Sequence, residues 1–288
     1  MEENRYNKAL QNHTFSLTDK EVSEKVNKLV SEKLTENNTR EVYKLLYSCI
    51  DLTTLNTTDT KEDVWRFIEK VNDFDGSNPE IENVAAICVY PNLVSTVKEA
   101  LTADVRIASV AGGFPASQTF TEVKIAETAL AVADGAEEID IVLSLGLFLN
   151  EEYKEMCEEI VEIKDACHGA TLKVILETGA LKTVADIHRA SVLSLYSGAD
   201  FLKTSTGKIY PGASPKAVYT MCHAIKSYYE KTKNKTGIKV SGGVSSVEDA
   251  VKYYTIVKET LGEEWLSPTL FRIGTSRLAD ILLKEITN

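Results

Sequence analysis

The sequence predicts an α/β fold, a (β/α)8 barrel of the TIM-barrel type preceded by an extra N-terminal helix. Short apolar runs rich in β-branched residues alternate with helical patterns along the chain, and the runs are apolar almost throughout. Such alternation implies a parallel sheet, and continuously apolar strands imply that helices cover it. With 288 residues, the chain has about the length that such a barrel needs.

The predicted barrel follows an N-terminal extension, residues 1–40. In this extension Thr18 and Glu21 form a capping box, and apolar residues follow at helical spacing, which predicts an amphipathic helix over 18–34. No internal repeat, low-complexity tract or Pro/Gly/Ser-rich linker divides the rest. We therefore assign residues 41–288 to a single barrel domain.

Eight strands are expected from the apolar runs. They cover Leu45–Leu52, Val84–Tyr90, Val105–Val110, Glu138–Leu143, Leu172–Glu177, Asp200–Thr204, Gly237–Val240 and Leu270–Ile273. The clearest helix between them has Ser214 as its N-cap and Pro215 at its first position. Another helix passes through Val64 and Ile68 and ends in a turn-rich segment before Pro79. An open doubly wound sheet is the alternative, but no GxGxxG motif follows the first strand.

Composition excludes several classes of function. Lys and Arg number 32 against 43 Asp and Glu, and the net charge of −11 disfavours a nucleic-acid partner. The longest apolar stretches are far shorter than the roughly 20 residues of a membrane-spanning helix, so we expect no membrane partner. The five cysteines form no CxxC pair and the four histidines have no metal-ligand spacing. We expect reduced thiols, no metal and, with a polar N-terminus, a cytosolic protein.

Two lysines stand in strands that are otherwise apolar. Lys203 lies in the run Asp200–Thr204, and Lys239 lies in the next strand near the same end. Burial and a neighbouring cation both lower the pKa of an amine, which frees it to attack a carbonyl. Lys203 is the candidate nucleophile and Lys239 the residue that perturbs it. The alternative is a strand lysine that reaches the rim of the barrel or pairs with a carboxylate.

A carboxylate embedded in the fourth strand accompanies these lysines. Asp140 is flanked by isoleucines, so we expect it to pair with Lys203 or Lys239, where it could transfer protons. A structural salt bridge without chemistry is the alternative. The same argument applies more weakly to Asp51 in the first strand. We expect Lys173, near the amino end of its strand, to lie on the face that serves stability rather than catalysis.

Glycine-containing loops follow the last three predicted strands. They are Gly207-Lys208, Gly242-Gly243-Val244-Ser245 and Gly274-Thr275-Ser276-Arg277. Backbone amides, hydroxyls and two cations would meet there, and the loops after strands seven and eight commonly bind phosphate in this fold. Together these loops predict a phosphate site at the carboxyl end of the barrel.

Motifs along most of the chain resemble one enzyme family. DLTTLN, AAICVYP, EEIDIVLS, LKVILETG, FLKTSTGK, IKVSGG and FRIGTS occur in the order and spacing of deoxyribose-phosphate aldolases, from about Leu45 to Lys284. The resemblance implies a class I aldolase without metal or cofactor. Its reaction would be the reversible cleavage of 2-deoxy-D-ribose 5-phosphate to D-glyceraldehyde 3-phosphate and acetaldehyde. We also expect a homo-oligomer, either a dimer or a tetramer.

The resemblance assigns roles to individual residues. It implies that Lys203 forms the Schiff base, that Lys239 lowers the pKa of Lys203 and that Asp140 relays protons. Asp51 is similar to an auxiliary polar residue, and Cys88 to a cysteine near the substrate that is not catalytic. The implied substrate and phosphate contacts are Thr204, Gly207, Lys208, Gly242, Gly243, Val244, Ser245, Gly274 and Ser276.

Two departures from the family pattern stand out. Arg277 occupies a position where other members often carry serine, and we expect it to strengthen the phosphate site. The chain ends at Asn288 without the terminal tyrosine that assists proton transfer in some members, which puts a tail-assisted step in doubt. Two rival functions remain: a Schiff-base aldolase or transaldolase with a different donor, and a non-catalytic sugar-phosphate binding protein. Two inward lysines beside a carboxylate argue against the second rival.

Overall fold

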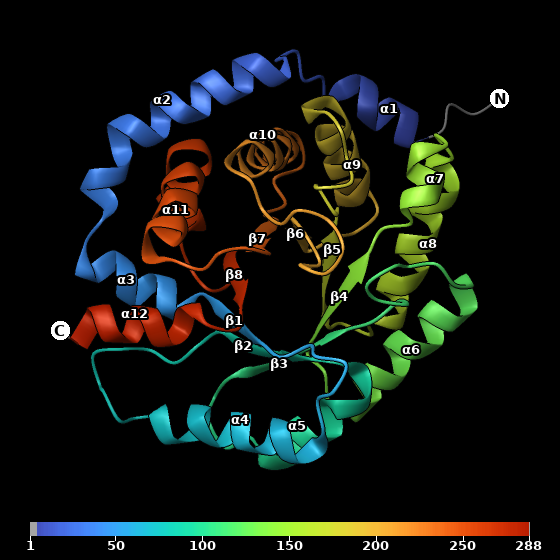
Figure 1. The fold of residues 1–288 in the computed structure, drawn as a ribbon. Coiled ribbons are helices and arrows are strands. Elements are labelled where there is room, and N and C mark those ends of the chain that lie inside the picture. The colour runs from blue at the N-terminus through green and yellow to red at the C-terminus, as the bar shows by residue number, and fades with distance from the viewer. Residues whose placement is uncertain (1–4, 288) are drawn as a thin grey trace.

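The computed structural model describes residues 5–287, and within that range the strands close into a parallel barrel in the order β1 to β8 (Figure 1). The strands are β1 Ile50–Thr53, β2 Ala86–Val89, β3 Arg106–Val110, β4 Glu138–Val142, β5 Thr171–Ile175, β6 Phe201–Lys203, β7 Gly237–Ser241 and β8 Phe271–Thr275. This closed sheet confirms the predicted (β/α)8 fold and excludes the open sheet.

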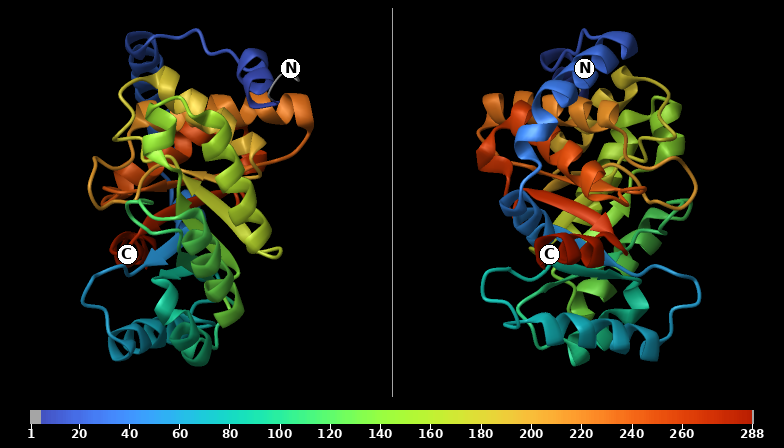
Figure 2. Two further views of the ribbon diagram at one scale, coloured as in Figure 1. Left: turned by 90° about the vertical axis from the view of Figure 1, so that its right-hand side faces the viewer. Right: turned by 60° about the vertical axis from the view of Figure 1, so that its left-hand side comes forward.

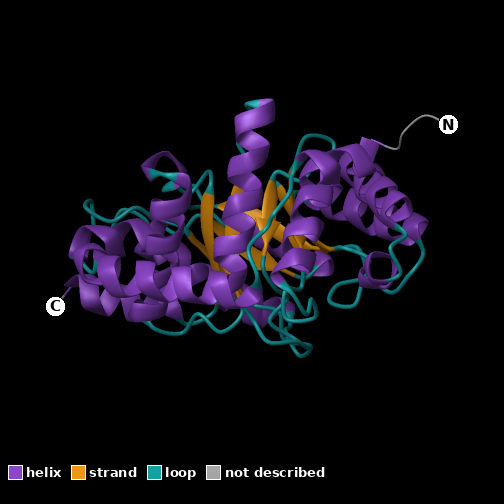
Figure 3. Ribbon diagram, turned by 90° about the horizontal axis from the view of Figure 1, so that it is seen from above, coloured by secondary structure: helices purple, strands orange, loops and turns teal. Residues whose placement is uncertain are grey.

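Helices surround the strands on the outside (Figure 3). They are α1 Arg5–Asn12, α2 Asp19–Asn37, α3 Arg40–Ser48, α4 Lys61–Phe74, α5 Val94–Ala100, α6 Thr121–Asp134, α7 Leu145–Leu149, α8 Tyr153–Ala166, α9 Val184–Tyr196, α10 Pro215–Thr232, α11 Val247–Leu261 and α12 Leu278–Thr287, with short 3-10 helices at Pro91–Leu93 and Glu263–Trp265. As predicted, Ser214 caps α10, and its hydroxyl accepts a hydrogen bond from the amide of Ala217 at 3.2 Å.

The first strand is shorter than predicted. The expected strand Leu45–Leu52 divides into the end of helix α3 and the strand β1. The side chain of Thr39 caps α3 by accepting a hydrogen bond from the amide of Val42, and Leu46 is fully buried on the helix. The apolar run therefore serves two consecutive elements, and its helical half was misread as strand.

The N-terminal extension packs against the outside of the barrel (Figure 2). The capping box at Thr18 and Glu21 begins α2, as predicted, and Val22 and Val26 bury its apolar face against α10 and α11. Helix α1, which the sequence pattern did not predict, packs against α9. The division of the chain at residue 40 stays a prediction.

Between residues 5 and 287, no helix is long and apolar enough to cross a membrane, and no group of His, Cys, Asp and Glu is placed to hold a metal ion. All five cysteines are free and buried.

A cluster of histidines lies where the extension meets the barrel helices. His13 hydrogen-bonds through Nδ1 to the Ser227 hydroxyl at 2.7 Å and through Nε2 to the Tyr196 hydroxyl at 2.8 Å. Phe15 stacks on His188 with ring centroids 4.9 Å apart. Burial lowers the pKa of His13 and of His188 to about 4 in each case. The contact is therefore built from neutral imidazoles.

These histidines should make stability depend on pH. Their folded-state pKa values lie below the unfolded value near 6.5, so the unfolded chain binds more protons as pH falls. We expect the melting temperature to fall between pH 7 and pH 5, before the carboxylates titrate, and to fall less in His13→Asn. Thermal unfolding at pH 7, 6 and 5 measures this. Equal pH dependence in both proteins would contradict the role of His13.

Candidate active site

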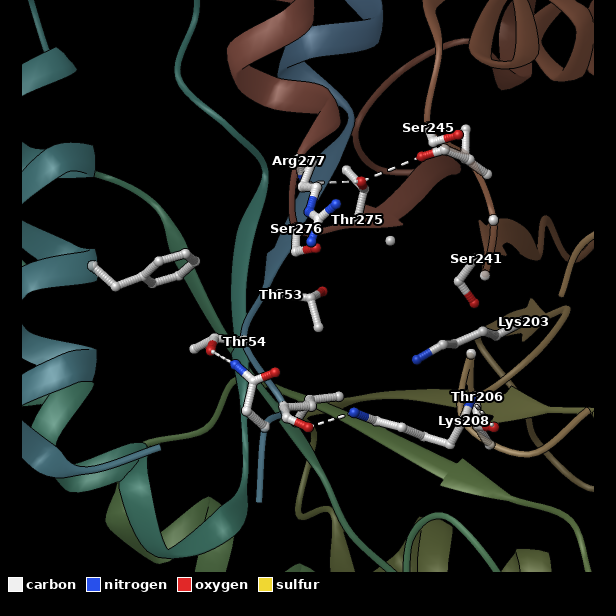
Figure 4. A pocket seen from close by; sticks show the side chains of 18 residues that line it. Thr53, Thr54, Lys203, Thr206, Lys208, Ser241, Ser245, Thr275, Ser276 and Arg277 are labelled. Carbon is white, nitrogen blue, oxygen red and sulfur yellow. Dashed lines mark hydrogen bonds between the residues drawn. The ribbon is translucent and has the colours of Figure 1, made fainter. Parts of the chain in front are cut away.

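A cavity of about 510 Å³ opens at the carboxyl ends of the strands (Figure 4). Its lining includes ten of the predicted site residues: Lys203, Gly207, Lys208, Gly242, Gly243, Val244, Ser245, Gly274, Ser276 and Arg277. The loop after β1, with Thr53, Thr54, Leu55 and Asn56, forms another part of the wall. Five other predicted residues do not line the cavity and are buried in or beside the barrel interior: Asp51, Cys88, Asp140, Thr204 and Lys239.

Asp140 on β4 lies at the centre of the charged groups in the barrel. Its Oδ2 accepts hydrogen bonds from the Nζ atoms of Lys203 and Lys239, each at 2.7 Å. Its Oδ1 accepts one from Lys173 at 2.9 Å. Register explains this convergence, because Lys203 pairs with Lys239 across β6 and β7 and Asp140 pairs with Lys173 across β4 and β5. The expected pairing of Asp140 with a lysine is therefore present, and with both candidates.

The pKa values of the two candidate lysines shift in opposite directions. Burial lowers the pKa of Lys203, and the charge of Lys239 lowers it further, while Asp140 opposes the change. Burial also lowers the pKa of Lys239, but the carboxylates of Asp140 and Asp51 outweigh it and raise this pKa overall. Of the two lysines, Lys203 is therefore the one that loses its proton more readily, while Lys239 is held in its charged form. Figure 4 shows the Lys203 amine pointing into the cavity.

The placement of Lys173 was wrong. It was expected on the stability face, but it is fully buried in the barrel interior, where it contacts Asp140 and, at 2.6 Å, Glu138. Strand β5 begins one residue earlier than predicted, and its stagger against β4 brings Lys173 level with Asp140. The position of Lys173 within its own strand does not reveal its level along the barrel axis.

Two further charged residues were missed by the sequence reasoning. Arg272 on β8 donates to both oxygens of Glu138, at 3.1 and 2.8 Å, and to Asp51 at 2.5 Å. Asp51 in turn lies 2.5 Å from the ammonium of Lys239. Both Glu138 and Arg272 are charged residues in apolar strands, which is the signal that identified Lys203. Applied to every strand, that signal would have found them.

An apolar wall faces these charges inside the barrel. Cys88 belongs to a small buried cluster with Leu55, Ala86, Ala108 and Val110. Burial raises the pKa of the Cys88 thiol, which keeps it protonated. The barrel interior thus has a charged side, from β4 through β8 to β1, and an uncharged side, mainly from β2 and β3.

Closely packed backbone forms the other end of the cavity. Gly242 has a φ of +83°, and a Cβ added to it would lie 2.8 Å from the Cα of Gly212. Only glycine suits that position, because both the backbone angle and the space exclude a side chain. Lys208 donates to the carbonyl of Leu55 across the cavity mouth, and Arg277 is exposed at the rim. Two cations, Lys208 and Arg277, and several glycines therefore surround the loop end of the cavity.

Comparisons with known proteins agree with this geometry. The model of the DeoC/LacD family of aldolases matches residues 45–266. The chain belongs to this family. A Caenorhabditis elegans protein is 42% identical over 93% of this chain and 89% of its own length. The deoxyribose-phosphate aldolase of Homo sapiens is 40% identical over 82% of this chain and 78% of its own length.

A solved structure supports the same family. The deoxyribose phosphate aldolase from Aeropyrum pernix, whose structure is described as tetrameric, superposes with a TM-score of 0.69 at 27% identity. The alignment covers 90% of this chain and 98% of that chain. The resemblance drawn from the motifs is therefore confirmed, and the protein is an aldolase with a (β/α)8 barrel.

Removing Arg272 should destabilise the fold strongly. Arg272→Met leaves Asp51 and Glu138 buried without their shared guanidinium, and breaking a buried ion pair in this way costs about 3–5 kcal/mol. The free energy of unfolding from urea titration measures this loss. As a control, Arg66→Met removes an exposed arginine on α4 and should cost less than about 1 kcal/mol. Similar costs for the two variants would refute the importance of the buried pairs.

Proposed function

We propose that the protein is a deoxyribose-phosphate aldolase that reversibly cleaves 2-deoxy-D-ribose 5-phosphate to D-glyceraldehyde 3-phosphate and acetaldehyde. One observation carries the mechanism: Lys203 faces the cavity with a lowered pKa, 2.7 Å from Asp140 and beside Lys239. The names of the relatives supply the substrate class.

Cleavage begins when the neutral amine of Lys203 attacks C1 of the open-chain sugar. Loss of water gives an iminium ion, and a base then removes the proton of the hydroxyl on C3. The bond between C2 and C3 breaks, its electron pair forms an enamine with the Lys203 nitrogen, and glyceraldehyde 3-phosphate leaves. Protonation of C2 and hydrolysis release acetaldehyde and restore the amine.

Asp140 and Lys239 are suited to move the protons in these steps, with water. Buried lysines outweigh the effect of desolvation and hold the pKa of Asp140 well below its usual range, so it stays a carboxylate. Lys239 stays charged and can donate a proton. The apolar side of the barrel, with Cys88 and Val110, would lie against the acetaldehyde carbons.

The phosphate would bind among the glycine loops, with Lys208 and Arg277 as cations. Binding this group away from C1 would hold the aldehyde in place before reaction, which lowers the entropic cost of the chemical step. Comparing acetaldehyde with dihydroxyacetone as donors separates this aldolase from one with a different donor.

We also propose that the protein acts in the cytosol and that it forms a homo-oligomer. The five free, buried cysteines suit a reducing compartment. The tetrameric description of the Aeropyrum pernix relative supports self-association.

Lys203 should carry the covalent intermediate. Borohydride reduction in the presence of acetaldehyde should add an ethyl group to the protein, and peptide mapping should find it on Lys203. In Lys203→Leu both the adduct and turnover should disappear, whereas Lys252→Leu, on the outer helix α11, should keep both. If a folded sample of the wild type forms no adduct on any lysine, the protein is a sugar-phosphate binder instead.

The rate of imine formation should report the charge of Lys239. The rate should rise with pH through the pKa of Lys203, because only the neutral amine attacks. Lys239→Met removes a repelling cation, raises the pKa of Lys203 and should move the profile to higher pH. Lys124→Met, which removes a buried ammonium outside the site, should leave the profile in place. An unchanged profile in Lys239→Met would refute this role.

A further inference from the structure

A buried glutamate lies behind the loop that follows β6. Glu177 is 2% exposed and lies just after β5. Its φ of +50° falls in the left-handed region, which non-glycine residues seldom adopt unless their surroundings hold them there. Within residues 5–287 no cation lies within ion-pair distance of its carboxylate. A carboxylate in this setting requires strong hydrogen bonds.

Those hydrogen bonds come from a single residue, Thr206. The backbone amide of Thr206 donates to Oε1 of Glu177 at 3.2 Å, and its hydroxyl donates to Oε2 at 2.5 Å. The same hydroxyl accepts a hydrogen bond from the amide of Lys208 at 3.1 Å. Glu177 therefore fixes the turn Thr206-Gly207-Lys208, and all three residues of this turn line the cavity whereas Glu177 does not.

Close backbone packing also limits how the loop after β6 can move. A Cβ added to Gly179 would lie 2.3 Å from the carbonyl oxygen of Pro211, and one added to Gly212 would lie 2.1 Å from that of Gly242. The β6 loop is thus in close contact with the loop after β5 and with the turn after β7. On the β5 side the carboxylate of Glu177 bonds Thr206, and the backbone amide of Thr178 donates to the carbonyl of Thr204 at 2.9 Å.

The reactive end of β6 is held separately. Thr204 exchanges two hydrogen bonds of 3.0 Å with the backbone of Ser241, and its amide donates to the carbonyl of Lys239. Lys203 keeps its own partner, Asp140. Backbone bonds from β7 and from the amides of Leu176 and Thr178 therefore hold the chain up to Thr204, and the carboxylate of Glu177 bonds it at Thr206.

We propose that Glu177 is a positioning residue for the phosphate end of the site. Through Thr206 it holds Gly207 and Lys208 at the cavity wall, so that they receive the phosphate of the substrate. This inference rests on the proposed function. It predicts that loss of Glu177 impairs binding of the phosphorylated substrate and leaves imine chemistry at Lys203 intact.

The test compares two substrates in one variant. For Glu177→Ala, KM for 2-deoxyribose 5-phosphate should rise about tenfold to a hundredfold, while kcat/KM for unphosphorylated 2-deoxyribose should change by less than about threefold. Inorganic phosphate should likewise inhibit the variant more weakly. Borohydride trapping of acetaldehyde at the wild-type rate shows that the variant is folded.

Second variants keep the test decisive if Glu177→Ala does not fold. Thr206→Val removes the hydroxyl, and this variant should lose the preference for phosphorylated over unphosphorylated 2-deoxyribose, as Glu177→Ala should. Thr206→Ser keeps a hydroxyl and should keep the preference. Glu159→Gln removes a buried carboxylate from an ion pair outside the site, so it should lower the melting temperature without changing the preference.

The outcomes separate this inference from the proposed function. If the wild type cleaves 2-deoxyribose 5-phosphate but Glu177→Ala loses activity equally toward both substrates, or toward neither, the positioning role is overturned and the function stands. If the wild type does not cleave that substrate, the proposed function itself fails.

Discussion

The structure depends on the balance of charge inside the barrel. Within the described residues, seven carboxyl, amine and guanidinium side chains are buried there: Asp51, Glu138, Asp140, Lys173, Lys203, Lys239 and Arg272. When Lys203 is a neutral amine, three cations face three carboxylates. A buried net charge is costly, so balance and burial together favour the form of Lys203 that can attack a carbonyl. The groups that stabilise the interior are thus also the groups that set the pKa of the proposed nucleophile, Lys203.

This arrangement gives different tasks to groups of the same type. Asp140 contacts three lysines, but Lys239 also has Asp51, so Lys239 is held in its charged form more firmly than Lys203. Arg272 does not line the cavity, and it balances the charges of Asp51 and Glu138. Removing the ion pairs of Arg272 should therefore affect the pKa of Lys203 as well as the stability of the fold. All of these groups share one low-dielectric interior.

The sequence predicted the barrel because strand and helix periods alternate clearly, and it predicted Lys203, Lys239 and Asp140 because charged residues interrupt apolar strands. It misplaced Lys173 because the height of a residue in a barrel depends on the stagger between strands, which a single strand does not reveal. Helix α1 was missed because eight mostly polar residues bury only Tyr6 and Ala9. Glu177 carries no periodic signal, since its importance lies in a loop contact with Thr206.

Strand β6 serves both ends of the proposed site, which raises the question of how they stay independent. Lys203 is its last residue, and the predicted phosphate loop begins a few residues later. The bonds between Thr204 and Ser241 hold the chain between them, so a shift in the loop need not reach Lys203. In a barrel each strand end has a neighbour on either side. Here backbone bonds from β7 and from the segment after β5 support the end of β6, while the carboxylate of Glu177 supports the loop. Substrate binding and imine chemistry can therefore be altered separately.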